Sequence, residues 1–184
     1  DLHSFPTRRS SDLTNGAYSR VVVGVDDPTV ALLSNGSEDT KGSSAVVAAH
    51  TALAALGESW FVGNCEGTDL LAGRFDVIVT DGFTGNVALK SLEGTAKFLL
   101  GELKGAIGDS KRVAVGALMI KPALKDLSQK LSGDAYGGAI FLGLKAPVLI
   151  GHGATSAEAV KNGTLACARA HDSRLVDRIA AEVA

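Results

Sequence analysis

The stretch TDGFTGN, residues Thr80–Asn86, decides the fold of this sequence. It follows FDVIV, residues 75–79, a short apolar and β-branched run that predicts a buried strand. It precedes residues 87–103, in which six apolar residues recur at helical spacing: Ala88, Leu89, Leu92, Ala96, Leu99 and Leu103. A strand, a glycine-bearing turn and a helix form the arrangement in which backbone N–H groups and the helix dipole converge on an anion.

Within this turn, Gly82 and Gly85 let the backbone come close to a ligand, and Asn86 either caps the helix or reaches into a cleft. An ordinary strand-to-helix turn capped by Asn86 explains the stretch equally well when it is taken alone. Asp76 and Asp81 flank the end of the strand, and we interpret both as helix-capping carboxylates rather than catalytic ones.

The whole chain has 184 residues, of which 46% are hydrophobic, and a formal charge of −2, which fits one soluble domain. Lys and Arg are scattered, so the charge gives no case for a nucleic-acid partner. Cys65 and Cys167 are too few for a disulfide framework or a zinc motif, which favours a reducing compartment. No apolar run approaches the roughly 20 residues that span a bilayer, although binding to a membrane surface stays open.

The N-terminal part of the chain begins with residues 1–12, which have no helix or strand period and no apolar signal-peptide core. We interpret residues 1–12 as a non-native leader and residues 13–184 as the domain. The β-branched content of residues 21–25 favours a strand, and residues 29–33 form a second such run. The polar residues 34–44 predict a loop.

A helix is predicted next, with Val46, Ala49, Leu53 and Leu56 on its apolar face and a stop at Gly57. Residues 60–62 predict a short strand that runs into a glycine turn at residues 63–67. Strands that alternate with helices predict an α/β domain with a mostly parallel sheet.

The C-terminal part begins with residues 113–131, which have a helical period that Pro122 should kink or split. Residues 140–144 and 148–150 are strand candidates. Ser156 begins a long helix that breaks near His171 and resumes to the C-terminus, with four expected core residues: Ala159, Val160, Leu165 and Cys167.

Three turns, at Lys41, Asn86 and His152, each lie between a predicted strand and a predicted helix. In an open α/β sheet such turns gather at the carboxyl edge, where ligands bind. Taken singly, a loop lysine is more often simply solvated, and a histidine between two glycines is as often satisfied locally as functional. The sequence contains no dinucleotide, Walker or nucleophile-elbow motif and no clustered metal ligands, so neither a cofactor nor a metal is expected.

Four stretches together resemble one known family, the bacterial phosphate acyltransferases. They are EDTKGS, FVGNCEGTDLLAGRFDVIVTDGFTGNVALKSLEG, DAYGGAIFLGLKAPVLIGHG and the helix that follows, and the resemblance covers about residues 15–171. Such enzymes transfer a fatty acyl group from acyl carrier protein to inorganic phosphate, giving an acyl phosphate for phospholipid synthesis. TDGFTGNVALK with the upstream GN-x-EG-x-DL pattern is far more specific than any single turn.

The resemblance implies a three-layer αβα fold similar to isocitrate and isopropylmalate dehydrogenases and to phosphotransacetylases. It also implies a metal-free, cofactor-free homodimer that binds the inner face of the cell membrane from the cytoplasm. Lys41 and Asn86 match the catalytic lysine and asparagine of the family. The remaining matched positions would bind phosphate or substrate: Gly82, Thr84, Gly85, His152 and Gly153.

This sequence departs from the family pattern in two places. The opening strand and glycine-rich turn of the family have no counterpart, so we expect the domain to be truncated at its N-terminus. The resemblance also makes residues 18–25 part of a helix, and we follow it there over the strand reading. The alternatives are a phosphotransacetylase-like enzyme that uses acyl-coenzyme A, and an inactive fragment that serves as a dimerisation or membrane-surface module.

Overall fold

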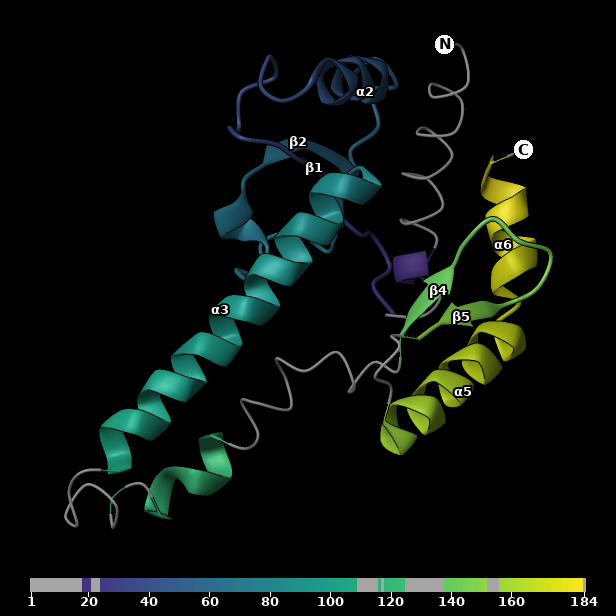
Figure 1. Ribbon diagram of the computed structural model, residues 1–184. Coiled ribbons are helices and arrows are strands. Elements are labelled where there is room, and N and C mark those ends of the chain that lie inside the picture. Colours follow the sequence, from purple (N-terminus) through teal and green to yellow (C-terminus); the bar gives the residue numbers. More distant parts are fainter. Residues whose placement is uncertain are drawn as a thin grey trace. The chain divides into compact units, whose positions relative to one another are not determined.

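The computed structural model describes residues 18–20, 24–108, 116, 118–124, 138–151 and 156–183 (Figure 1). These residues divide into two compact units. The first holds the described residues up to Asp81, together with Ile140–Val148 and those from Cys167 onward. The second begins at Gly82 and contains the long helix α3. Each unit is described by itself.

The first unit is built on a parallel sheet of three strands in the order β2-β1-β3. β1 (Val30–Leu33) lies in the middle, with β2 (Phe61–Cys65) on one side and β3 (Val77–Val79) on the other. All four residues of β1 are buried, as expected for a central strand with both faces covered. The sequence prediction of an α/β fold with a parallel sheet is therefore confirmed.

Asp76 joins the start of β3 to the start of β1. Its Oδ2 accepts hydrogen bonds from the backbone N–H of Thr29 at 2.9 Å and from the Thr29 hydroxyl at 2.7 Å. The expectation that Asp76 caps a helix is wrong, because its carboxylate satisfies donors of the neighbouring strand instead.

β2 extends further than the sequence suggested. The strand was expected to end at Val62, but it continues through Gly63 and Asn64 to Cys65. Gly63 has φ +93°, and Val62 and Gly63 together lie opposite the single residue Ala31, because Val30 pairs with Phe61 and Leu32 with Asn64. Gly63 therefore forms a bulge inside the strand rather than the start of a turn.

The helix α2 (Ser44–Ala54) follows β1 after the predicted polar loop. Ser43 caps it, since its hydroxyl accepts a hydrogen bond from the N–H of Val46 at 3.3 Å. Leu53 is buried, and Gly57 ends the turn after the helix with φ +67°. The helix was predicted correctly, but it ends at Ala54, so Leu56 lies in the turn that Gly57 closes and not in the helix.

At the N-terminal side, Tyr18, Ser19 and Arg20 are helical. The N–H of Gly24 donates to the carbonyl of Ser19 at 3.0 Å, and Gly24 has φ +83°, which ends this helical turn. The strand pattern over residues 21–25 is contradicted at Val25, which has no regular structure. The helix reading over residues 18–25 agrees at residues 18–20 and is wrong at Gly24 and Val25, which have no regular structure. Residues 21–23 lie outside the described residues.

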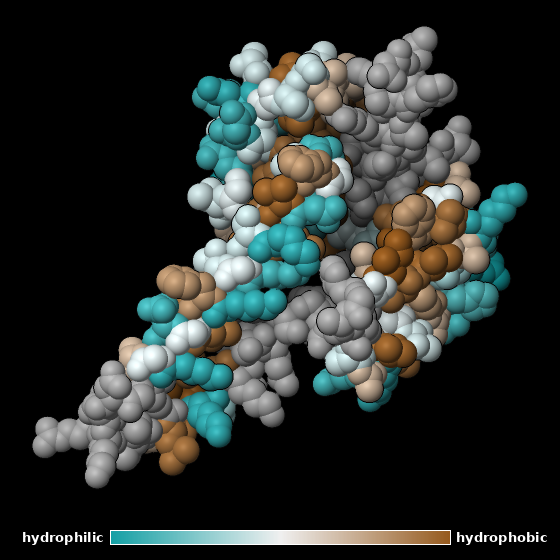
Figure 2. Space-filling view, viewed as in Figure 1, coloured by the Kyte–Doolittle hydropathy of each residue, from teal (hydrophilic) through white to brown (hydrophobic). Residues whose placement is uncertain are grey.

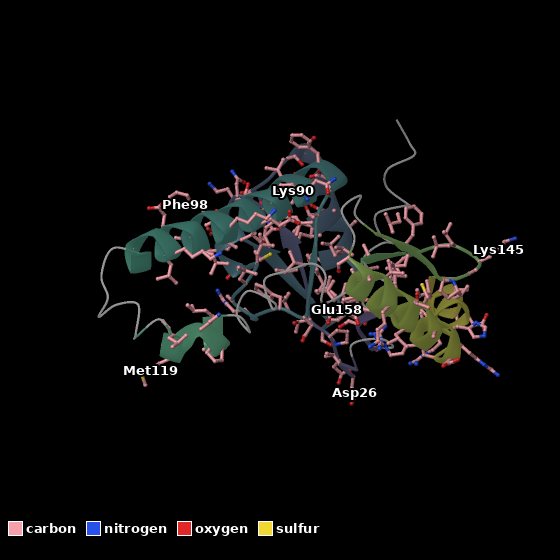
Figure 3. All side chains as sticks on the ribbon, turned by 60° about the horizontal axis from the view of Figure 1, so that its bottom comes forward. Asp26, Lys90, Phe98, Met119, Lys145 and Glu158 are labelled. Carbon is pink, nitrogen blue, oxygen red and sulfur yellow. The ribbon has the colours of Figure 1, made fainter. Side chains whose placement is uncertain are left out.

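The second unit contains α3 (Gly82–Gly108), a helix of 27 residues. Its predicted apolar face is not buried, since Leu89, Leu99 and Leu103 are exposed. Phe98 also points away from the helix, and Lys90 pairs with Glu93 at 2.9 Å (Figure 3). Residues 118–124 form a further helical segment that contains Pro122, so the helix is not split at that residue. The kink that Pro122 was expected to cause stays a prediction.

The chain ends in a two-stranded sheet and two helices. β4 (Ala139–Phe141) and β5 (Val148–Ile150) pair as a hairpin. They form a sheet of their own, separate from the three-stranded sheet. β4 is shorter than the predicted strand over residues 140–144, because Leu142 and Gly143 form a turn. Figure 2 shows hydrophobic side chains at the surface of this region, where Phe141 and Val148 are exposed.

The helices α5 (Ala157–Asp172) and α6 (Leu175–Val183) agree with the predicted long, broken helix. Ser156 caps α5 by accepting a hydrogen bond from the N–H of Ala159 at 3.1 Å. Of the four expected core residues, Ala159 is buried and Cys167 half-buried, whereas Val160 and Leu165 are exposed. In the first unit, a small core forms from both helices and their neighbours: Ala170, Leu175, Ile179, Tyr18, Ile140 and Leu142.

Candidate functional site

The carboxyl ends of the three parallel strands lie at one edge of the sheet. Leu32 of β1 pairs with Asn64 of β2 and with Val79 of β3. The loop with Lys41 leaves β1 at this edge, and the chain that leads into α3 leaves β3 there. This is the sheet edge at which open α/β folds bind ligands.

The Lys41 loop, residues 34–43, is tied to the sheet by hydrogen bonds to β2. The N–H of Ser34 donates to the carbonyl of Cys65 at 2.8 Å. The side-chain amide of Asn64 donates to the carbonyl of Glu38 at 2.9 Å, and the N–H of Lys41 donates to that same carbonyl at 3.0 Å. The Glu38 carbonyl therefore joins β2 to the turn that carries Lys41.

The Lys41 side chain itself lies against Gly36. A methyl group at Gly36 would come within 2.8 Å of Lys41 Cγ, so a larger residue there would displace the lysine side chain. Among the described residues, no carboxylate lies within ion-pair distance of the Lys41 ammonium, and Lys41 is exposed. Its charge is thus available to an anion from solution.

The loop has a second support beneath it. The buried His50 of α2 lies with Nε2 3.4 Å from Oδ1 of Asp39, and its ring packs edge-on against Phe61 at 5.2 Å between ring centroids. Gly42, with φ +107°, closes the loop where a methyl group would come within 2.8 Å of the Ser34 hydroxyl and 2.9 Å of Val46. These contacts restrict the backbone on both sides of Lys41.

The helix after β3 begins five residues earlier than the sequence suggested, at residue 82 instead of residue 87. α3 starts at Gly82, directly after Asp81, so Asn86 is the fifth residue of the helix and does not cap it. The glycine-bearing turn predicted before the helix is therefore helical from Gly82 onward, and Gly82 and Gly85 lie in the first turn of α3. The first turn of α3 also contains Thr84, and its backbone N–H groups have no hydrogen-bond acceptor within the helix. Asn86 is exposed.

The GNCEGTDLLAG stretch, residues 63–73, begins in β2 and leads towards β3, and its own polar groups hold it. Asp69 accepts a hydrogen bond from the N–H of Glu66 at 2.9 Å and pairs with the Arg74 guanidinium at 3.0 Å, which fixes the 3₁₀ turn η2 (Gly67–Asp69). Burial raises the pKa of the Cys65 thiol to about 11, with a further contribution from the charge of Asp69. At neutral pH the thiol is therefore protonated.

His152 and Gly153 lie outside the described residues. Lys41 belongs to the first compact unit, whereas Gly82, Thr84, Gly85 and Asn86 belong to the second. The convergence of Lys41 and Asn86 on one cleft therefore stays a prediction.

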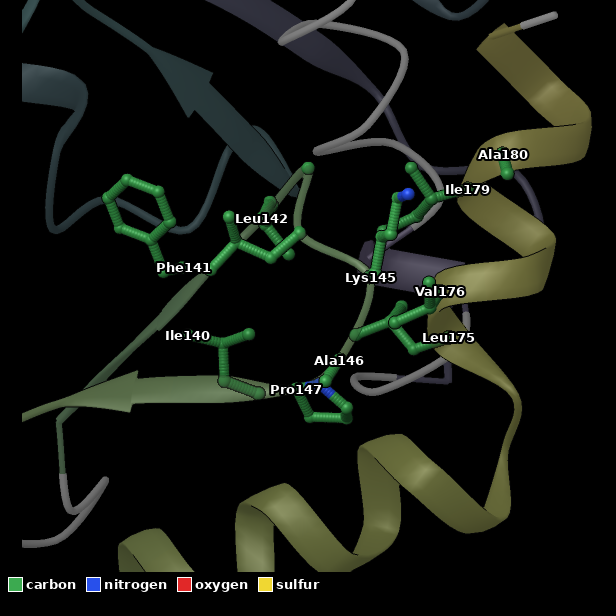
Figure 4. Close-up of a pocket in the computed structure, with 12 residues that line it drawn as sticks. Ile140, Phe141, Leu142, Lys145, Ala146, Pro147, Leu175, Val176, Ile179 and Ala180 are labelled. Atoms are coloured by element: carbon green, nitrogen blue, oxygen red, sulfur yellow. The ribbon is translucent and has the colours of Figure 1, made fainter.

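The first unit also contains an apolar pocket of about 250 Å³ between the β4–β5 connection and α6 (Figure 4). Leu142, Pro147 and Ile179 line it, and Lys145 supplies its charged group. None of the predicted site residues lines this pocket, so it is not the predicted phosphate site. Within the described ranges, no group of three His, Cys, Asp or Glu side chains could hold a metal ion.

Sequence reasoning missed Asn64 as part of this site. The asparagine is only 6% exposed, and its Oδ1 has no hydrogen-bond partner among the described residues. The Ser34 hydroxyl, at the end of β1, is likewise buried without a partner in the described part of the chain. The signal in the sequence was a polar residue, Asn64, directly after an apolar run. It was missed because residues 63–67 were predicted to be a glycine turn, in which an asparagine is common.

The chain resembles known proteins over most of its length. Residues 13–178 match the family described as Fatty acid synthesis protein. The phosphate acyltransferase of Lactococcus lactis subsp. cremoris (strain SK11) is 50% identical over 144 residues, which are 78% of this chain and 44% of that protein. The phosphate acyltransferase of Anaeromyxobacter sp. (strain K) is 45% identical over 172 residues, 94% of this chain and 47% of that protein. The chain thus spans less than half the length of these curated relatives.

Proposed function

The chain belongs to the fatty acid synthesis protein family, and from this premise we propose that it transfers a fatty acyl group from acyl carrier protein to inorganic phosphate. The acyl phosphate formed would enter phospholipid synthesis. The relatives named phosphate acyltransferase support the reaction class. The TKG turn, which contains Lys41, and the GFTGN turn, which contains Asn86, support the roles that we propose for these two residues.

The observation that carries this proposal is the arrangement of the sheet edge. β1 and β3 are parallel neighbours in register, and the chain segments that lead to Lys41 and to the first turn of α3 leave from their carboxyl ends. A cation on the loop after β1 and a strand-to-helix turn after β3 are each suited to bind a dianionic substrate.

In the proposed reaction, an oxygen of phosphate attacks the thioester carbon, and a tetrahedral intermediate with a negative oxygen forms. The C–S bond then breaks, the carrier thiolate leaves, and the acyl group stays on phosphate. Lys41 neutralises the phosphate or the oxyanion, because a preorganised cation stabilises developing charge. Asn86 orients the attacking phosphate, and the first turn of α3, with Gly82, Thr84 and Gly85, binds its oxygens. His152 and Gly153 complete the substrate site.

We propose the finer features of the family as well. The complete fold is a three-layer αβα arrangement similar to isocitrate dehydrogenases and phosphotransacetylases. The protein works as a homodimer on the cytoplasmic face of the cell membrane. Residues 118–120 support a surface role, because Leu118 is 69% and Met119 80% exposed, and Met119 points away from its helix (Figure 3). No helix among the described residues is long and apolar enough to cross a membrane.

The experiment measures release of free carrier protein from acylated carrier protein, with and without phosphate. It uses this chain and a chimera in which the chain replaces the matching part of the Lactococcus lactis relative. We expect phosphate-dependent release and formation of acyl phosphate. Activity with acyl-coenzyme A alone would favour the phosphotransacetylase-like alternative, and no phosphate dependence in either protein would reject the reaction.

A further inference from the structure

We propose that Asn64 is a positioning residue that sets the place of Lys41 through the carbonyl of Glu38. This inference rests on the proposed function of Lys41. Its basis is a single acceptor shared by two donors, the Asn64 side-chain amide at 2.9 Å and the Lys41 backbone N–H at 3.0 Å.

Asn64 is suited to position Lys41 because it belongs to the buried sheet of the first unit. It lies on β2, pairs in register with Leu32 of the buried strand β1, and is only 6% exposed. The Lys41 loop is exposed over most of its length, so its position depends on the few hydrogen bonds that reach the sheet. One of these bonds comes from the Asn64 side chain.

Asn64 acts on the position of Lys41 through the hydrogen bond that its side-chain amide donates. Asn64 Nδ2 donates to a carbonyl that already closes the turn at Lys41, which fixes the backbone from which the lysine side chain extends. The contact of Lys41 Cγ with Gly36 then limits the direction of that side chain. A leucine at position 64 would fill a similar volume but would leave the Glu38 carbonyl without this donor.

A matched control exists at the opposite end of the same sheet. Thr29→Val removes side-chain hydrogen bonds between β1 and Asp76 and also weakens the sheet. Thr29 lies at the amino end of β1, away from the loop that follows its carboxyl end. A general loss of stability would affect both variants, whereas a positioning role affects Asn64→Leu alone.

The first test is amide hydrogen exchange on the full chain. We expect the Lys41 N–H to exchange about tenfold faster in Asn64→Leu, and at the parental rate in Thr29→Val. Parental exchange at Lys41 in Asn64→Leu would overturn the proposal. Equal acceleration at Lys41 in both variants would also overturn it.

The second test measures phosphate-dependent thioester cleavage. We expect Asn64→Leu to lower kcat about tenfold with little change in KM for the acylated carrier, and to have no further effect in a Lys41→Ala background. An additive loss in the double variant would show that Asn64 does not act through Lys41. Absence of phosphate-dependent cleavage in the parent would reject the proposed function, and hydrogen exchange would then decide the role of Asn64 by itself.

Discussion

Asp76 and Thr29 form three hydrogen bonds, with donors on both residues, that join β3 to β1 at the amino edge of the sheet. The Thr29 N–H and hydroxyl both donate to Asp76 Oδ2, at 2.9 and 2.7 Å, and the Thr29 oxygen accepts from the Asp76 N–H at 3.1 Å. The two residues are 47 positions apart in the sequence. The pair therefore fixes the register of two strands that no local turn connects.

The same pair predicts a pH dependence of stability. Hydrogen bonds from the Thr29 backbone and side chain lower the pKa of Asp76 below its ordinary value of 3.8. The ionised carboxylate therefore stabilises the fold above about pH 3.8, and this contribution is lost as the pH falls through the lower pKa of the folded state.

We expect Asp76→Asn to lower the free energy of unfolding at pH 7 by about 1 kcal/mol. The difference from the parent should shrink as the pH falls below 3.8. Urea unfolding across this range checks it, with the exposed Asp26→Asn as the control. A difference that stays constant down to pH 2 would contradict the role of the Asp76 charge.

Gly42 and Gly57 offer a second test, because both have positive φ but different surroundings. Gly57→Ala meets no atom within 4 Å and should cost only the αL penalty of about 1 kcal/mol. Gly42→Ala should cost about 3 kcal/mol, since its φ of +107° lies outside the αL region and its methyl group meets Ser34 and Val46. Thermal unfolding compares the two, and equal losses would argue against a tightly closed Lys41 loop.

The elements that the sequence predicted well are those whose signal is local. The β-branched run before Ser34, the capped helix after Ser43 and the stop at Gly57 each depend on neighbouring residues. The start of α3 could not be predicted in this way, because Gly82 and Gly85 disfavour a helix by intrinsic propensity, yet both lie within it. The bulge at Gly63 depends on pairing with β1, which the sequence of β2 does not encode by itself.

The residues of the candidate site show the same contrast between local and distant signals. Lys41 and Asn86 were found from short motifs in the turns after two strands. Asn64 was not, because its importance comes from the Glu38 carbonyl, 26 positions away in the sequence. Leu99, on the apolar face predicted for α3, is exposed. Helical periodicity shows which residues share a face, but it does not show what covers that face.

The exposed apolar residues 118–120 predict binding to a lipid surface. Leu118 and Met119 are far more exposed than is usual for large apolar side chains in a packed domain. We expect Leu118→Glu to reduce co-sedimentation with anionic liposomes several-fold, and Leu124→Glu to do so less, since Leu124 is half-buried.

The matched control for this prediction is Leu71→Glu, because Leu71 is 68% exposed in the first unit and receives the same change of charge. Equal loss of binding in the Leu71 and Leu118 variants would indicate a general charge effect. Unchanged binding in both Leu118→Glu and Leu124→Glu would remove the membrane role of this segment.

The sharpest prediction concerns Lys41 and Asn86 together. Attack of phosphate on a thioester brings a multiply charged nucleophile towards an oxygen on which negative charge develops. A fixed cation beside both is worth several kcal/mol, and loss of one such preorganised group lowers the rate by about 10² or more. We therefore expect Lys41→Ala and Asn86→Ala each to reduce acyl-phosphate formation by about 10². Both residues are exposed, so neither change should alter the free energy of unfolding appreciably.

Lys161→Ala is the control, because Lys161 is an exposed lysine on α5 and its removal changes the net charge equally. We expect it to retain the parental rate of carrier release. Lys41→Arg separates charge from shape: a guanidinium keeps the charge but cannot reproduce the compact ammonium, so partial activity is expected. Near-parental rates in both alanine variants would reject the assignment of these residues. Loss of activity only together with loss of folding would instead make them structural, because a group that acts on the transition state changes the rate while the protein stays folded.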